Sequence, residues 1–230
     1  MMQLRELFDG QLPRLVMFDL DGTLVDSVPD LAAAVDKVLL DLGRAPAGVA
    51  RVRDWVGNGA SVLVRRALAG GLQHAHVAEA DAAEALQLFM QAYAENHALT
   101  RVYPGVKDML GWLTEQGIAL AIVTNKPERF VAPLLDEKGL GGYFRWIVGG
   151  DTLPQQKPDP AALLHILRLA QVEARQALFV GDSRNDVLAA KAAGVPCVAL
   201  SYGYNHGRPI AEESPARVID DLRELLLATE

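Results

Sequence analysis

Cysteine is nearly absent from this sequence, because Cys197 is the only one among 230 residues. An intrachain disulfide is therefore excluded. Cys197 lies in the apolar run 196–200, as expected of a small buried side chain. A catalytic thiol would need a histidine or a helix N-terminus beside it, and the surrounding sequence indicates neither.

Long apolar runs and an excess of positive charge are also missing. No stretch approaches the roughly 18 to 20 consecutive apolar residues that cross a membrane. Residues 1–13 lack the apolar core of a secretion signal. The 22 lysines and arginines are outnumbered by 29 acidic residues, which gives a net charge of -7. Nucleic acids and acidic membrane surfaces select for the opposite balance. We therefore expect a cytoplasmic protein with no nucleic-acid partner and no membrane partner.

The sequence does contain enough apolar residues for a full core, since half of them are apolar and 22% are charged. Short continuous apolar runs end abruptly at polar residues, as is typical of parallel strands covered on both faces. Amphipathic helical patterns lie between them, so the sequence predicts an α/β fold with a doubly wound parallel sheet, a Rossmann-like core. The expected strands are 14–18, 118–123, 146–148, 177–180 and 197–200, with 217–219 as a weaker edge strand. The expected core helices are 106–116, 128–138, 160–170 and 184–193, with a final helix near 220–228.

One long segment interrupts this alternation with helical periodicity alone. Breaks rich in glycine divide it into candidate helices at 29–42, 50–55, 60–69 and 77–97. The sequence therefore predicts a small all-α domain at 26–98, inserted after the first strand of an α/β core made of 1–25 and 99–230. Two connecting segments between the domains would form a natural hinge.

Two aspartates follow the first expected strand, in the sequence Asp19-Leu20-Asp21-Gly22-Thr23. Ligands of α/β sheets bind beyond the carboxyl ends of the strands, which is where Asp19 lies. Gly22 permits a sharp turn that folds Asp21 back over it. Two carboxylates this close repel each other unless a cation or a shared proton separates them. Taken alone, the motif is also compatible with a strand followed by an acidic surface turn.

Polar side chains also follow the next three strands of the expected core, and in chain order they are Thr124, Asn125, Lys157, Asp182 and Asp186. In isolation, each is compatible with a polar strand end or a solvated surface residue. Together, four consecutive strands would bring carboxylates, a hydroxyl, an amide and an amine to one edge of the sheet. That combination predicts an active site.

This four-part pattern resembles the haloacid dehalogenase superfamily of phosphotransferases, over essentially the whole chain. The motifs Asp19-x-Asp21-Gly22-Thr23 and Gly181-Asp182-x-x-x-Asp186 carry the resemblance. The segment 26–98 is similar to the small helical cap of that superfamily. Three further stretches look like those of bacterial phosphoglycolate phosphatases, at 55–59, 123–127 and 202–205.

The resemblance implies a phosphoric monoester hydrolase that acts through an aspartyl-phosphate on Asp19, since a carboxylate can form such a covalent intermediate. Asp21 would give a proton to the leaving group and later take one from the hydrolytic water. Mg²⁺ would supply positive charge between carboxylate and phosphate. Its ligands would be Asp19, the backbone carbonyl of Asp21 and Asp182, while Asp186 would hold metal-bound water. Lys157 would neutralise the remaining phosphoryl charge.

Substrate contacts are expected from both the core and the cap. Thr124 and the backbone amides around Leu20 and Asn125 would donate hydrogen bonds to the phosphoryl oxygens. Because the positive charge of the core is used by the phosphate, we expect Asn58 and Arg65 of the cap to meet an anionic leaving group. Arg65 is also compatible with a solvated helix face.

The leading hypothesis is hydrolysis of 2-phosphoglycolate, a small phosphorylated metabolite, to glycolate and phosphate, by a monomer or homodimer. Other substrates stay open, such as N-acetylmuramate 6-phosphate, another sugar phosphate or a nucleotide. A mutase similar to β-phosphoglucomutase and a non-catalytic sensor of phosphorylated ligands are further alternatives. Asp21 argues against the sensor, which has no use for a general acid, and against a dehalogenase, which expels halide and needs no leaving-group proton.

Overall fold

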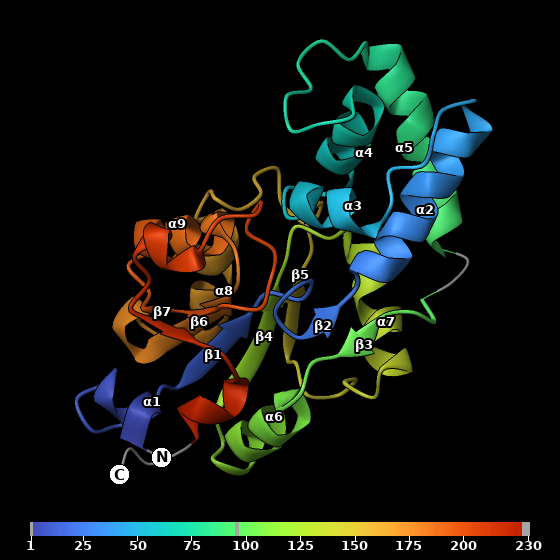
Figure 1. The fold of residues 1–230 in the computed structure, drawn as a ribbon. Helices are drawn as coiled ribbons and strands as arrows, with labels where there is room; N and C mark the ends of the chain where they lie inside the picture. Colours follow the sequence, from blue (N-terminus) through green and yellow to red (C-terminus); the bar gives the residue numbers. More distant parts are fainter. Residues whose placement is uncertain (1, 95–96, 227–230) are drawn as a thin grey trace.

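The computed structural model describes residues 2–94 and 97–226, and its core is a six-stranded parallel sheet (Figure 1). The strands are β1 Leu15–Phe18, β4 Ala119–Val123, β5 Trp146–Val148, β6 Ala177–Gly181, β7 Cys197–Leu200 and β8 Arg217–Ile219. They are ordered β5-β4-β1-β6-β7-β8, so β1 is central. Leu15 lies beside Ala119 of β4 on one side and beside Ala177 of β6 on the other. The predicted doubly wound α/β fold is confirmed, including its weaker edge strand.

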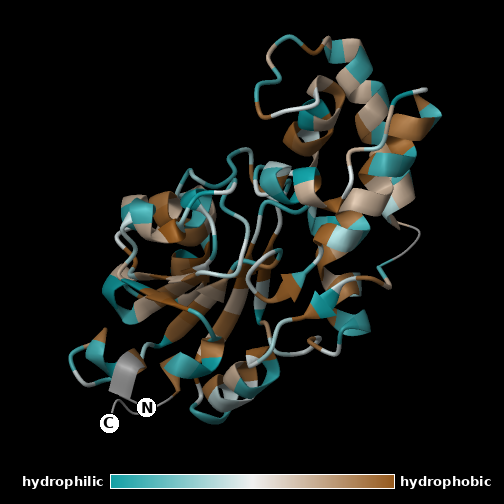
Figure 2. Ribbon diagram, viewed as in Figure 1, coloured by the Kyte–Doolittle hydropathy of each residue, from teal (hydrophilic) through white to brown (hydrophobic). Residues whose placement is uncertain are grey.

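Helices cover both faces of this sheet, which explains why its strands are continuous apolar runs. Alternate side chains of β1 point to opposite faces. Val16 and Phe18 pack in one apolar layer, and Leu15 and Met17 pack in the other. The first layer includes α6 Val106–Glu115 and α7 Val131–Glu137, and the second includes α8 Ala161–Ala170 and α9 Arg184–Ala193. Figure 2 shows the strands as largely hydrophobic ribbons between these helices.

Between β1 and β4 the chain forms a helical cap, made of α2 Val28–Asp41, α3 Val49–Trp55, α4 Ala60–Ala69 and α5 Glu79–Ala94. The cap has its own apolar cluster, in which Val35, Trp55 and Phe89 are buried. Phe130 and Tyr204 of the core belong to the same cluster, so the cap rests on the core through apolar contacts. Figure 1 shows the cap beyond the carboxyl ends of the central strands.

Two short antiparallel strands lead the chain into and out of the cap. They are β2 Val25–Asp26 and β3 Arg101–Val102, and Val25 lies beside Val102. The sequence did not predict them, because two residues are too few for an alternating pattern to show. They lie in the connections expected to form the hinge. The domain boundaries at 26 and 98 stay a prediction.

The helix expected at 128–138 differs in its first turn. Residues Glu128–Phe130 form a 3-10 helix, and α7 begins at Val131. Pro127 precedes this turn in an extended conformation, with ψ of 131°. Pro133 has no backbone N–H to donate to the preceding turn. Two prolines therefore tighten a segment whose apolar spacing alone predicted one continuous α-helix.

The chain ends and the last cap helix also differ from expectation. The helix expected near 220–228 is a 3-10 helix at Leu222–Leu225, and residues 227–230 lie outside the described part. The helix expected at 77–97 is α5, and residues 95–96 lie outside the described part. An unexpected helix, α1 Met2–Glu6, is too short for its periodicity to show.

Candidate active site

The turn after β1 brings the first and fourth motifs together. Asp19 stays bonded to the sheet, because its backbone N–H donates to the Val180 carbonyl at 2.9 Å. The chain then turns at Gly22, whose φ is +90° and where a Cβ would clash with the Asp182 carboxylate. Thr23 closes the turn, since its hydroxyl donates to Asp182 Oδ1 at 2.7 Å. The glycine and the threonine of the motif are thus required by the close approach of Asp182.

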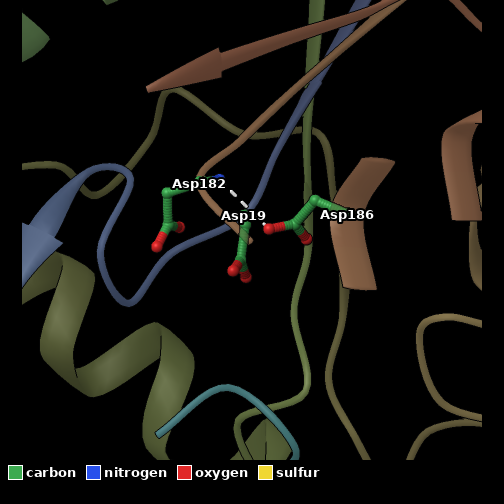
Figure 3. Close-up of side chains that lie close together, drawn as sticks. All are labelled: Asp19, Asp182 and Asp186. Atoms are coloured by element: carbon green, nitrogen blue, oxygen red, sulfur yellow. Dashed lines mark hydrogen bonds between the residues drawn. The ribbon is translucent and has the colours of Figure 1, made fainter. Parts of the chain in front are cut away.

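Three buried carboxylates converge at this edge of the sheet (Figure 3). Oxygens of Asp19, Asp182 and Asp186 lie within 4.8 Å of one another, and we call these three residues the acidic cluster. Asp186 lies in the first turn of α9, and its Oδ2 is held by the backbone N–H groups of Asp182 at 3.1 Å and Ser183 at 2.9 Å. The Ser183 hydroxyl donates to the same oxygen at 2.7 Å. Asp186 is therefore fixed by its own helix N-terminus.

Lys157 lies within the acidic cluster and its side chain is only 2% exposed. Its Nζ is 2.6 Å from Asp186 Oδ1 and 3.0 Å from Asp19 Oδ1. Burial alone lowers the pKa of Lys157, but the carboxylates of Asp186 and Asp19 outweigh it and raise the pKa above its ordinary value. The lysine is therefore a permanent cation between two of the three acids.

The charge balance of the acidic cluster favours a further cation. Burial raises the pKa of Asp19 to about 6, against the opposing effect of Lys157. Burial and the charges of Asp186 and Asp19 raise the pKa of Asp182 well above its ordinary value. Three carboxylates share one ammonium, so negative charge is in excess when all are ionised. Carboxylate oxygens are ligands of hard divalent cations. The residues present therefore fit a metal such as Mg²⁺.

Thr124 and Asn125 follow β4 and lie in the same pocket as Asp19 and Asp21. The Asn125 side chain holds the Lys157 backbone, because Oδ1 accepts from its N–H at 3.0 Å and Nδ2 donates to its carbonyl at 2.9 Å. Nδ2 also lies 3.0 Å from the Gly57 carbonyl of the cap. The side chain of Asn125 thus joins three segments of the chain.

The residues that line the site pocket come from the core and the cap, and they are Asp19, Asp21, Leu31, Val56, Gly57, Gly59, Ala60, Leu63, Phe89, Tyr93, Thr124, Asn125, Lys126, Pro127 and Phe130. Most of the cap side chains in this set are apolar.

Asn58 and Arg65, the two cap residues expected to meet a leaving group, are not among the residues that line the pocket. Arg65 instead forms an ion pair with Glu79, and its side chain is 19% exposed. The Oδ1 atom of Asn58 is buried and has no hydrogen-bond partner among the described residues.

Two pocket residues were missed as functional candidates. Lys126 Nζ lies 3.1 Å from Asp21 Oδ1 and 2.6 Å from the Tyr93 hydroxyl. The position of Lys126, directly after Thr124 and Asn125, was a signal that could have been used. Tyr93 had none, because it lies in the cap helix α5 among apolar residues.

The arrangement of acids, lysine and threonine can be compared with known families. The family model of the haloacid dehalogenase-like hydrolases matches residues 13–194. This chain belongs to the haloacid dehalogenase-like hydrolases. The match includes the acidic cluster, Lys157 and the whole cap, so the resemblance expected from the motifs is confirmed.

Relatives within this family are close in sequence and in fold. The chain is 70% identical over 221 residues to a phosphoglycolate phosphatase of Pseudomonas fluorescens, covering 96% of this chain and 81% of the relative. It is 70% identical to phosphoglycolate phosphatase 1 of Pseudomonas aeruginosa, covering 95% of this chain and 80% of the relative. A crystal structure of a predicted phosphoglycolate phosphatase from Haemophilus somnus has a TM-score of 0.87 and 41% identity, covering 93% of this chain and 96% of that chain. The chain is thus an enzyme of the phosphoric monoester hydrolase class.

Among residues 2–94 and 97–226, no helix has the length and apolar character needed to span a bilayer.

Proposed function

We propose that this haloacid dehalogenase-like hydrolase converts 2-phosphoglycolate and water to glycolate and phosphate, through an aspartyl-phosphate on Asp19. The observation that carries the proposal is the position of Asp19. Its carboxylate lies 3.0 Å from the Lys157 ammonium and lines one pocket together with Asp21. A nucleophile, a cation and a second acid are the groups that phosphoryl transfer requires.

The first step forms a bond between an Asp19 oxygen and phosphorus, and the bond from phosphorus to the ester oxygen breaks. Lys157 places a fixed positive charge beside the attacking carboxylate, where it offsets the repulsion between two anions. Thr124 and the backbone N–H of Asn125 are placed to donate to the phosphoryl oxygens. Mg²⁺, held by Asp19, Asp182 and the Asp21 carbonyl, would add further positive charge at the phosphoryl group. Asp186, which its own helix N-terminus fixes, would orient the remaining waters of the ion.

Asp21 is assigned the proton transfers. Its side chain lines the pocket together with Asp19 and is 14% exposed, whereas Asp182 and Asp186 are buried. It gives a proton to the departing glycolate oxygen in the first step. In the second step it takes a proton from the water that attacks the aspartyl-phosphate, which restores both the acid and Asp19.

The choice of substrate is supported by the relatives and by the pocket. Both Pseudomonas relatives carry the name phosphoglycolate phosphatase. The cap lines the pocket with apolar side chains, among them Leu31, Leu63 and Phe89. The several hydroxyl groups of a hexose would lose their water against these side chains, at a cost of about 1 to 3 kcal/mol for each one left without a hydrogen bond. The leaving group of 2-phosphoglycolate presents a single polar group, its carboxylate, and the same pocket holds the cation Lys126.

Kinetics on a matched set of phosphate esters tests this proposal. We expect kcat/KM for 2-phosphoglycolate to exceed that for glucose 6-phosphate, N-acetylmuramate 6-phosphate and AMP by at least about tenfold. Conversion of β-glucose 1-phosphate without release of phosphate would instead indicate a mutase. A higher kcat/KM for any of the other esters would refute the glycolate assignment and leave the mechanism on Asp19 in place.

A further inference from the structure

A second buried lysine, besides Lys157, lines the pocket. Lys126 follows β4, and its side chain is 2% exposed. Its Nζ lies 3.1 Å from Asp21 Oδ1 and 3.3 Å from Asp21 Oδ2. The same ammonium lies 2.6 Å from the Tyr93 hydroxyl and 4.4 Å from the centre of the Tyr93 ring. A core cation is therefore held between the proposed general acid and a cap tyrosine.

The two lysines have different partners. Lys157 is bound between Asp19 and Asp186, so its charge serves the phosphoryl end of the site. Lys126 contacts neither of those acids in the described structure. Among the described residues that line the pocket, Lys126 is the only cation. Any second negative charge on a substrate therefore has one cation to meet there.

Tyr93 adds a hydrogen-bond donor to this cation. Burial raises the pKa of Tyr93 to about 12, against the opposing effect of Lys126, so the phenol keeps its proton at neutral pH. Its oxygen accepts a hydrogen bond from Lys126 Nζ. A phenol can accept through its oxygen and still donate its own proton. The pair can thus offer an N–H and an O–H to the two oxygens of one carboxylate.

The position of the pair matches the length of a small acid. Asp21 is the group that protonates the ester oxygen, and Lys126 touches its carboxyl group. In phosphoglycolate a single methylene separates that ester oxygen from the carboxylate carbon. When the ester oxygen lies next to Asp21, the substrate carboxylate is therefore within reach of Lys126. Phe89 and Phe130 line the same pocket and exclude water, which strengthens such an ion pair.

We propose that Lys126 and Tyr93 form an anion subsite that binds the carboxylate of the leaving group and selects two-carbon acid phosphates. This inference rests on the proposed function and specifies it. It differs from the expectation that Asn58 and Arg65 of the cap would meet the anionic leaving group. The cation comes from the core, and the cap contributes Tyr93.

The test compares 2-phosphoglycolate with ethyl phosphate, which has the same two-carbon chain and no carboxylate. The measured quantity is the ratio of the two kcat/KM values, for the wild type and for three variants. Lys126→Met removes the cation and keeps a long side chain. Tyr93→Phe removes the hydroxyl and keeps the ring. Lys107→Met, at an exposed position on α6, is the control that changes net charge by the same amount.

We expect Lys126→Met to lower the ratio by roughly ten- to a hundredfold, as for a lost hydrogen bond to a charged group. Tyr93→Phe should lower it by a smaller factor of about three to ten. Lys107→Met should leave the ratio unchanged. 2-Aminoethyl phosphate, which carries a cation in place of the carboxylate, should gain relative to ethyl phosphate in Lys126→Met, because the repulsion by Lys126 is gone.

Three other outcomes would separate this inference from the proposed function. If the wild type prefers 2-phosphoglycolate and Lys126→Met loses activity on both esters in equal proportion, the lysine only supports Asp21 and the subsite is refuted. If Lys126→Met does not fold, an unchanged ratio in the folded Tyr93→Phe variant refutes the subsite equally. If the wild type shows no preference for 2-phosphoglycolate over ethyl phosphate, the proposed function itself is wrong.

Discussion

At the scale of single residues, two lysines form ion pairs with different carboxylates of the site. Lys157 balances Asp19 and Asp186 in the acidic cluster, and Lys126 lies beside Asp21. Each lysine is buried and each keeps its positive charge, because neighbouring carboxylates raise the pKa against the effect of burial. The two acids of the first motif therefore lie in different environments, although a single residue separates them. Different environments allow different chemical roles.

Substitution of the two aspartates of the first motif should have different effects on the reaction. Asp19→Asn should abolish turnover and phosphoenzyme formation, because an amide is a poor nucleophile. Asp21→Asn should lose the proton transfers, yet with p-nitrophenyl phosphate, whose leaving group needs no proton, it should still form the phosphoenzyme. Mass spectrometry of acid-quenched protein measures this. A phosphoryl group found on any residue other than Asp19 would refute the mechanism.

At the scale of secondary-structure elements, one carboxylate joins the two ends of the cap. Asp30, in the first turn of α2, is buried. It accepts hydrogen bonds from the backbone N–H groups of Leu99 and Thr100 and from the Thr100 hydroxyl. Leu99 and Thr100 immediately precede β3, so this contact fixes the exit from the cap to its entry. The sequence gives no sign of it, because an aspartate in the first turn of a helix is common on surfaces.

Removal of this carboxylate should destabilise the fold. Asp30→Ala leaves the buried Thr100 hydroxyl without its acceptor, and we expect the free energy of unfolding to fall by about 1 to 3 kcal/mol. Asp41→Ala is a matched control on the same helix, since its side chain is 47% exposed and it contacts Lys37 in an ordinary surface ion pair. The control should change stability by less than about 0.5 kcal/mol. Urea denaturation curves measure both, and equal effects would contradict the structural role of Asp30.

At the scale of the whole molecule, one turn of the cap is hydrogen-bonded to two asparagines of the core. The Gly57 carbonyl, between α3 and α4, accepts from Asn125 Nδ2 and Asn185 Nδ2, each at 3.0 Å. Asn125 also binds the Lys157 backbone. The same side chain thus touches the cap and the segment that carries a cation of the site. Cap position and site geometry are therefore mechanically linked.

Metal binding should affect both the activity of the enzyme and the stability of its fold. Chelation with EDTA should abolish activity, Mg²⁺ should restore it, and Ca²⁺ should not, because its looser coordination misaligns Asp19. Mg²⁺ at a hundred times its dissociation constant should stabilise the fold by about 2.7 kcal/mol, or roughly 5 to 10 °C in Tm. Asp182→Asn should lose most of this shift, and Asp108→Asn, at an exposed position, should keep it. Full activity in chelator, with metal removal verified by elemental analysis, would contradict the prediction.

Much of the fold was predictable, because it follows from local patterns. Apolar runs with polar ends predicted the strands of the sheet, and helical periodicity predicted the cap. The elements that were missed or altered are short or depend on single residues. Strands β2 and β3 have two residues each, α1 has five, and prolines tighten the start of the helix at 128–138. Local periodicity carries no information at that length.

The sequence by itself determined which chemical groups meet at the edge of the sheet. Asp19, Thr124 and Asp182 each follow a strand, and parallel strands bring their carboxyl ends to one edge. Only the tertiary structure decided what the cap contributes. Tyr93 and Arg65 lie on neighbouring cap helices, yet Tyr93 lines the pocket and Arg65 pairs with Glu79. A helix sequence shows which residues share a face of the helix, but packing against the core decides which face lines the pocket.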